Sequence, residues 1–110
     1  MAVAYKILGQ VVANGSIQSL CGNGTPSAGS QVISTIVACN RTNVGKTFRV
    51  AVRPNGTTLA TQHYLAYDTA IPPNDTIVMT LGITLSSTEV VEVLGSDSNV
   101  SFSAFGSVIS

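Results

Sequence analysis

Short apolar runs separated by turn-forming residues extend through the whole chain and constrain its fold more than any other feature. The clearest alternation is in Thr47–Arg53, where Phe48, Val50 and Val52 fall on one side. A side-chain period of two is that of a β-strand, and no long window shows the 3.6-residue period of a helix. The expected strands are Tyr5–Val12, Ile17–Leu20, Gln31–Arg41, Thr47–Arg53, His63–Thr69, Thr76–Leu85, Val90–Leu94 and Val100–Ser107.

The residues between these runs favour turns. Asn14-Gly15 is a favoured two-residue hairpin turn, and Pro54-Asn55-Gly56 supplies the fixed and positive φ angles of a tight turn. Pro72-Pro73 stiffens a corner because neither proline can donate to a β-ladder. Gly22–Gly29 is an irregular loop, and Gly82 predicts a bulge inside its strand.

Gln31–Arg41 differs from the other runs because it is apolar on both faces. This pattern is typical of a central strand that is covered on both sides. With about eight short strands in 110 residues, we expect one domain over 1–110, an all-β, two-sheet antiparallel β-sandwich. Jelly-roll and immunoglobulin-like connections both fit the strand spacing, and we favour the jelly-roll.

Charge is scarce, since only 9% of residues are charged and five cations balance five acids. A neutral chain has no general attraction for nucleic acid or anionic lipid. No run approaches the roughly 18 apolar residues of a membrane helix, and residues 1–10 lack a signal-peptide pattern. We therefore expect neither nucleic acid nor membrane as a partner. A surface of this kind repels its own copies weakly, which favours a homo-oligomer.

Catalytic chemistry is not indicated. His63 is the only histidine, and no serine lies in a nucleophile-elbow motif. Asp75 sits in the proline corner, where its side chain is expected to bond local backbone. Asp68 and Glu92 lie on predicted strands and should face solvent or an arginine. We expect no enzyme activity and no catalytic residue.

The two cysteines, Cys21 and Cys39, do not have the spacing of a metal site, and no second histidine is available. One interpretation pairs them in a disulfide. The favoured one places Cys39 as a small buried residue of the central strand. Gly22–Gly29 lacks the Lys-Ser/Thr and the following helix of a phosphate loop, so no cofactor is expected.

Residues 1–10 allow two interpretations. Tyr5, Ile7 and Leu8 could anchor an extended arm that adds as a strand to a neighbouring protein, which would make them interface residues. Alternatively, the run pairs within its own sheet.

Three stretches together resemble a known family: ISTIVACNR with TFRVAVRPNG, HYLAYDTAIPPND leading into TIVMTLGITL, and VSFSAFGS. They are similar to small structural proteins of tailed bacteriophage virions, especially phages of cyanobacteria. The likeness runs from about Gln31 onward and rests on strands and corners rather than on chemistry.

The resemblance implies a virion component assembled in the host cytoplasm, with other virion proteins as partners, such as the major capsid protein or tail proteins. A capsid decoration (cement) protein is the first expectation, and a baseplate or tail-fibre attachment protein the second. A carbohydrate- or partner-binding β module is the third, although the chain has no Trp for sugar stacking.

Overall fold

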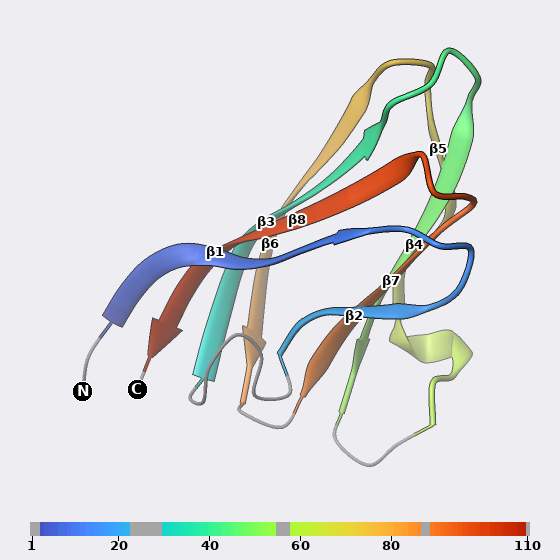
Figure 1. Ribbon diagram of the computed structural model, residues 1–110. Helices are drawn as coiled ribbons and strands as arrows, with labels where there is room; N and C mark the ends of the chain where they lie inside the picture. Colours follow the sequence, from blue (N-terminus) through green and yellow to red (C-terminus); the bar gives the residue numbers. More distant parts are fainter. Residues whose placement is uncertain (1–2, 23–29, 55–57, 87–88, 110) are drawn as a thin grey trace.

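The computed structural model describes residues 3–22, 30–54, 58–86 and 89–109 (Figure 1). Each predicted run is a strand, with ends within two residues of those expected. No described helix has the length and apolar character needed to cross a membrane. The elements are β1 (Val3–Val12), β2 (Gln18–Gly22), β3 (Ser30–Asn40), β4 (Lys46–Arg53), the 3-10 turn η1 (Thr61–His63), β5 (Tyr64–Ile71), β6 (Thr76–Leu85), β7 (Val90–Gly95) and β8 (Val100–Ile109).

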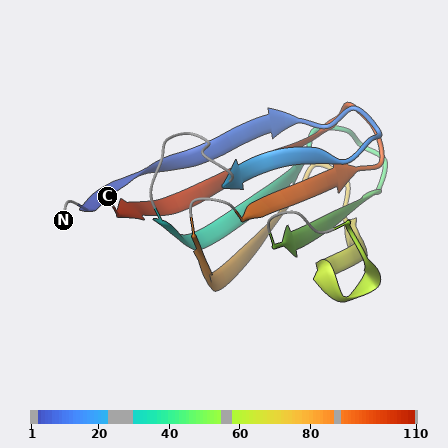
Figure 2. The same cartoon turned by 90° about the horizontal axis from the view of Figure 1, so that it is seen from below.

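The strands form two four-stranded antiparallel sheets packed face to face (Figures 1 and 2). The first sheet has the order β1-β8-β3-β6, and the second sheet has the order β2-β7-β4-β5. Only β4 and β5 follow each other within one sheet, so every other connection crosses between the sheets. This arrangement is a jelly-roll, which decides between the two topologies that the sequence allowed.

The core lies between the sheets and is built from the inward residue of each pleat. Phe48 of the second sheet packs against Phe102 of the first, with ring centroids 6.1 Å apart and planes tilted by 59°. Both rings are buried, and so is Val50. The alternation of Thr47–Arg53 therefore predicted the inward side of β4 correctly.

The Asn14-Gly15 turn forms, but it does not close a hairpin. Gly15 has φ 82°, and the Asn14 Oδ1 atom accepts a hydrogen bond of 3.0 Å from the Ser16 amide. Since β1 pairs with β8 whereas β2 pairs with β7, the turn carries the chain from one sheet to the other. The hairpin prediction was wrong because a local turn preference does not determine the pairing partner.

Other predicted turns have mixed outcomes. The register between β3 and β6 shifts between Thr80 and Ile83, where Gly82 was expected to cause a bulge. Gly22–Gly29 and Pro54-Asn55-Gly56 lie almost wholly outside the described residues. The proline corner is held by buried Asn40, whose Nδ2 donates to the Ile71 and Pro72 carbonyls at 3.2 Å each.

The predicted arm is part of the sandwich. β1 pairs with β8 along its whole length, from Val3 opposite Ile109 to Val12 opposite Ser101. Leu8 is buried in the core and is unavailable to a neighbour. The arm interpretation is therefore wrong for residues 3–10, because the apolar residues of this run complete the molecule's own sheet.

Candidate interaction surface

The carboxylates of the chain all bond to nearby groups of the same molecule. Asp68 accepts two hydrogen bonds from Arg49, at 2.7 and 3.2 Å, and these bonds hold the pKa of Asp68 below its ordinary value. Glu92 is bound in the same bidentate way by Arg53, at 2.8 and 3.1 Å. Both acids thus face an arginine, one of the two environments expected from the sequence.

The remaining acids have local roles. Asp97 pairs with Lys46, whose hydrogen bond lowers the pKa of this carboxyl group. The Asp75 Oδ1 atom accepts the Thr76 amide at 2.7 Å, and the Glu89 Oε1 atom accepts the Ser86 amide at 2.8 Å. Each of these three carboxylates is thus bound to a lysine or to a backbone amide close to it.

His63 and the two cysteines lie apart. The His63 Nδ1 atom accepts the Ala60 amide at 2.9 Å, which gives this side chain a structural role at η1. Cys21 is buried in the second sheet, and burial raises the pKa of its thiol to about 12. Cys39 belongs to the first sheet and is only half-buried, because its neighbours Ala38 and Asn40 point into the core.

Both thiols are free, so the disulfide interpretation is wrong, and the expected full burial of Cys39 is wrong as well. Over the described ranges, no three residues of the types that bind metals lie together.

The outward face of the first sheet is the most distinctive surface of the molecule. The registers of its four strands place sixteen outward side chains in four rows of four, and none of them is charged. We call this surface the uncharged face. Its rows, from β1 through β8 and β3 to β6, are Tyr5, Ser107, Val32 and Thr84; Ile7, Phe105, Thr35 and Thr80; Gln10, Ser103, Val37 and Val78; and Val12, Ser101, Cys39 and Thr76.

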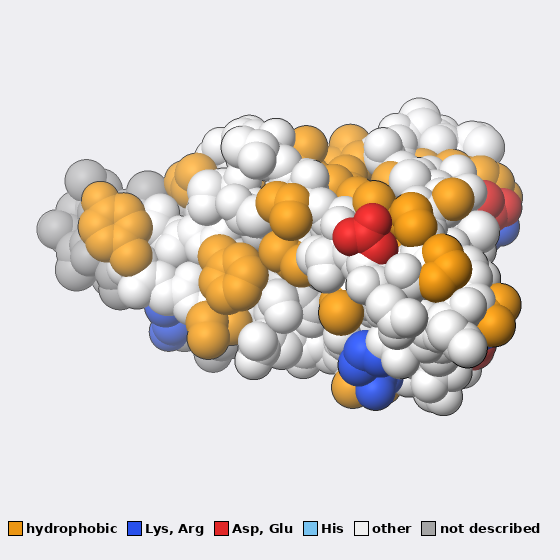
Figure 3. Space-filling model, turned by 90° about the horizontal axis from the view of Figure 1, so that it is seen from above, with side chains coloured by type: hydrophobic (Ala, Val, Ile, Leu, Met, Phe, Trp, Pro, Cys, Tyr) orange, Lys and Arg blue, Asp and Glu red, His pale blue; other side chains and the backbone are white. Residues whose placement is uncertain are grey.

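The apolar side chains of the uncharged face lie among neutral hydroxyl, amide and thiol groups. Val78, Val12 and Ile7 are each at least half exposed, at 59%, 56% and 50%. Figure 3 shows apolar side chains spread among neutral ones over this side of the molecule, with few charged groups. The surface can therefore contribute apolar burial and neutral hydrogen bonds to a partner, but almost no ion pairs.

The central strand β3 explains why this face stands out. Its inward residues Ile33 and Ile36 are buried in the core, whereas the outward Val37 is only half-buried. The sequence predicted a strand covered on both sides, and within this chain only one side is covered by the described residues. The outward residues of β3 are thus as apolar as those of a buried strand, yet no described part of the chain covers them.

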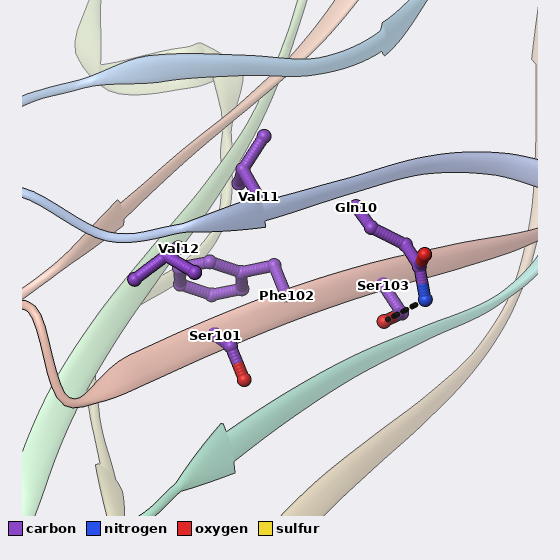
Figure 4. Close-up of a pocket in the computed structure, with 6 residues that line it drawn as sticks. All are labelled: Gln10, Val11, Val12, Ser101, Phe102 and Ser103. Carbon is purple, nitrogen blue, oxygen red and sulfur yellow. Dashed lines mark hydrogen bonds between the residues drawn. The ribbon is translucent and has the colours of Figure 1, made fainter.

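A hollow of about 250 Å³ opens on the uncharged face between β1 and β8 (Figure 4). Gln10 and Ser103 border it, and the Gln10 Nε2 atom donates to the Ser103 Oγ atom at 3.3 Å. Val12 and Ser101 form its other end. None of the residues that line the hollow carries a charge.

The outward face of the second sheet has the opposite character. Its two arginine–carboxylate pairs cross the strands, and the Arg49 guanidinium lies 3.9 Å from the Tyr67 ring centroid. Tyr64 meets Tyr67 edge-on, with centroids 4.9 Å apart. Ala51 is buried on this face, against which η1 folds (Figure 2). The arginines and carboxylates of this face are thus paired with each other, and the exposed Tyr67 ring already has an arginine on it.

Of the interface residues expected from the sequence, the structure places two on the uncharged face. Tyr5 and Ile7 are exposed in neighbouring rows on β1, while Leu8 points inward. The β1–β8 register shifts between Ile7 and Gly9, and this bulge separates the two directions. Sequence reasoning missed the rest of the face, because its residues come from four distant strands.

The sequence matches no protein-family model and no curated protein. The fold is similar to part of a chain in the structure of infectious bursal disease virus, Gx strain, with a TM-score of 0.55 and 17% identity. The match covers 96% of this chain and 31% of that chain, so the present chain spans about a third of its length. At this identity, the likeness shows a shared fold.

Proposed function

We infer that this protein is a structural component of a virus particle and binds neighbouring virion proteins through the uncharged face. The observation that carries the inference is the central strand β3, which is apolar on both sides but covered by the described chain on one. In its more specific form, the proposal is a decoration (cement) protein on the shell of a tailed bacteriophage, assembled in the host cytoplasm.

The fold and the sequence support this proposal independently. Jelly-rolls occur in viral capsid domains, and the structural match is to a chain of a virus structure. The stretches from Gln31 onward resemble small structural proteins of tailed phages. Lectin domains share the fold as well, but the Arg49 guanidinium already occupies one face of the exposed Tyr67 ring.

The proposed role requires no catalysis. Each carboxylate is held by an arginine, a lysine or a local amide, and the single histidine accepts a backbone amide. General acid or base chemistry requires a group that can reach a substrate in an accessible site. The hollow on the uncharged face has no such group among its lining residues.

The chemistry of the face determines how it would hold a neighbour. Valine, isoleucine and phenylalanine side chains contribute apolar burial, and the serines and threonines between them satisfy neutral hydrogen bonds. Binding that favours the assembled shell stabilises it by mass action. Because charges contribute little, raising the salt concentration should not release the protein.

A particle-binding assay tests the proposal. Particles of the virus that carries this gene, prepared without the protein, are mixed with recombinant chain and pelleted. We expect the wild-type chain to co-sediment, in 0.1 M as in 1 M salt. Val37→Lys, at the centre of the face, should abolish co-sedimentation because it would bury an unpaired charge.

Leu65→Lys is the matched control, because Leu65 is an exposed aliphatic residue of β5 in the second sheet. This variant should bind as the wild type does. Co-sedimentation of Val37→Lys at the wild-type level would overturn the assignment of the face, and failure of the wild-type chain to bind would overturn the virion role.

A further inference from the structure

We propose that two copies of this chain associate through the edge of β6, so that their first sheets join into one continuous antiparallel sheet. β6 ends the first sheet, with β3 on one side and no described strand on the other. The free side of a terminal strand presents unpaired amide and carbonyl groups that can form a ladder with another chain. This inference concerns the isolated protein and does not rest on the virion role.

The inward side of β6 is the first observation. Four large apolar residues point inward from this strand, yet they pack on the core only partly buried, whereas the inward residues of β3 are buried. The second sheet therefore covers the end of the first sheet incompletely. These residues are Ile77, Met79, Leu81 and Ile83.

The second observation is that β6 is poorly protected against pairing. Edge strands are commonly protected by charged residues, by shortness or by irregularity. β1 carries Lys6, β2 has only five residues, and β5 carries Asp68 and is broken by two register shifts. β6 has ten residues without a charge or a proline, and its one irregularity lies at Gly82.

A second copy of the same strand fits this edge. In an isologous contact the same surface meets itself, so a charged edge would oppose like charges, whereas β6 has none. Residues paired across an antiparallel ladder point to the same face. On β6 the inward residues have odd numbers and the outward residues have even numbers. An odd-numbered residue of one copy must therefore pair with an odd-numbered residue of the other, and an even-numbered residue with an even-numbered one.

One such register pairs Thr80 with itself at the twofold axis. On the outward side, Thr–Thr pairs of this kind are favourable in antiparallel sheets. On the inward side, Met79 then faces Leu81 of the second copy. Ile77 faces Ile83 in the same way. The partly buried inward side chains of the two copies therefore pack against each other across the joined strands. A ladder of nine residues supplies roughly as many hydrogen bonds as a typical interface contains, about ten.

The contact closes as a dimer and does not propagate as a fibre. Propagation would require β6 of one copy to pair with a different terminal strand of the next, either β1 in the same sheet or the short β2 or irregular β5 in the second sheet. β1 lies against β2 of the opposite sheet, since a side chain at Gly9 would run into the Leu20 carbonyl. Lys6 also places a charge on β1. The β6 edges therefore pair with each other.

Light scattering on the purified chain, with two valine variants, tests the contact. Val78 and Val12 are equally exposed, at 59% and 56%, and both lie on the uncharged face, at opposite edges of the first sheet. We expect a dimer for the wild type and for Val12→Lys. Val78→Lys should raise the dissociation constant roughly tenfold or more, because it places a lysine, a residue that commonly protects edge strands, on the pairing strand of each copy and opposite Gly82 of the other.

Crosslinking tests the register, in a Cys39→Ser background that removes the half-buried thiol. Thr80→Cys should form a disulfide-linked dimer under mild oxidation, since opposite residues in a ladder have Cα atoms within disulfide range. Thr84→Cys should not, because in this register two copies of residue 84 lie about 27 Å apart.

Three outcomes would overturn the proposal. The first is a wild-type chain that is monomeric at about 100 μM, a concentration at which a nine-residue ladder should hold. The second is dissociation by Val12→Lys but not by Val78→Lys, which would place the contact at the β1 edge of the first sheet and not at the β6 edge. The third is equal crosslinking of the two cysteine variants, which would exclude this register. Circular dichroism spectra that match the wild type establish that each variant is folded.

Discussion

Two phenylalanines of β8 allow the contribution of the core to stability to be measured separately from that of the uncharged face. Phe102 and Phe105 lie three residues apart on β8 and point to opposite sides of the first sheet. Phe102 is 1% exposed and packs against Phe48, whereas Phe105 is 36% exposed beside Ile7 and Thr35. Truncating each to alanine should therefore have different costs.

For Phe102→Ala the cost combines lost burial with a cavity that the rigid sandwich cannot fill. Such changes destabilise proteins by about 3–5 kcal/mol, out of a total of roughly 5–15 kcal/mol for a domain. Phe105→Ala loses about two-thirds of the burial energy of a phenylalanine and leaves no cavity, which amounts to about 1–2 kcal/mol. The two variants should thus differ in unfolding free energy by about 1–4 kcal/mol.

Urea and thermal unfolding, followed by far-UV circular dichroism, measure the two costs. Phe102→Ala should lower the Tm by roughly 15–30 °C, and Phe105→Ala by clearly less. If the proposed role is correct, Phe105→Ala should also lose affinity for particles, since its ring belongs to the uncharged face. If Phe105→Ala were as destabilising as Phe102→Ala, the Phe105 ring would be part of a core. The uncharged face would then not be an exposed surface at this position.

Three further expectations follow from single residues. Because ion pairs lower the pKa of Asp68 and Asp97, their stabilisation is present above about pH 4 and lost as the pH falls through the folded values. The Tm should therefore fall between pH 5 and pH 2, and less steeply in Asp68→Asn; equal slopes would contradict this. Asn74 has φ 52°, so Asn74→Ala should cost about 1 kcal/mol while Asn74→Gly stays near neutral in urea melts, and equal costs would argue against the left-handed backbone. In the native protein a thiol reagent should modify Cys39 and spare buried Cys21 until unfolding, and two fast thiols would contradict the burial.

Strand positions could be predicted from the sequence because the side-chain period is a local property. The alternation around Phe48 fixed which side of β4 faces the core, and Pro72-Pro73 marked a real corner. Pairing was not predictable, as the Asn14-Gly15 turn shows. Its residues specify a tight reversal, but whether the next strand returns to the same sheet depends on distant partners, β8 and β7.

The candidate surface was harder to predict for a related reason. An apolar strand such as β3 looks the same in sequence whether its second side is covered by its own fold or left for another molecule. Cys39 was expected to be buried on that basis and is only half-buried. The bulge at Leu8 likewise turns one of three candidate interface residues inward, a local shift that strand periodicity does not reveal.

The central claim, that this jelly-roll is a virion component held by its uncharged face, is tested most directly by a cryo-electron microscopy map of the intact particle. We expect density for this fold on the particle, with the outward side of β1, β8, β3 and β6 buried against a neighbouring protein. The arginine–carboxylate face of the second sheet should point away from that contact. A particle without this density, or with the uncharged face open to solvent, would contradict the account.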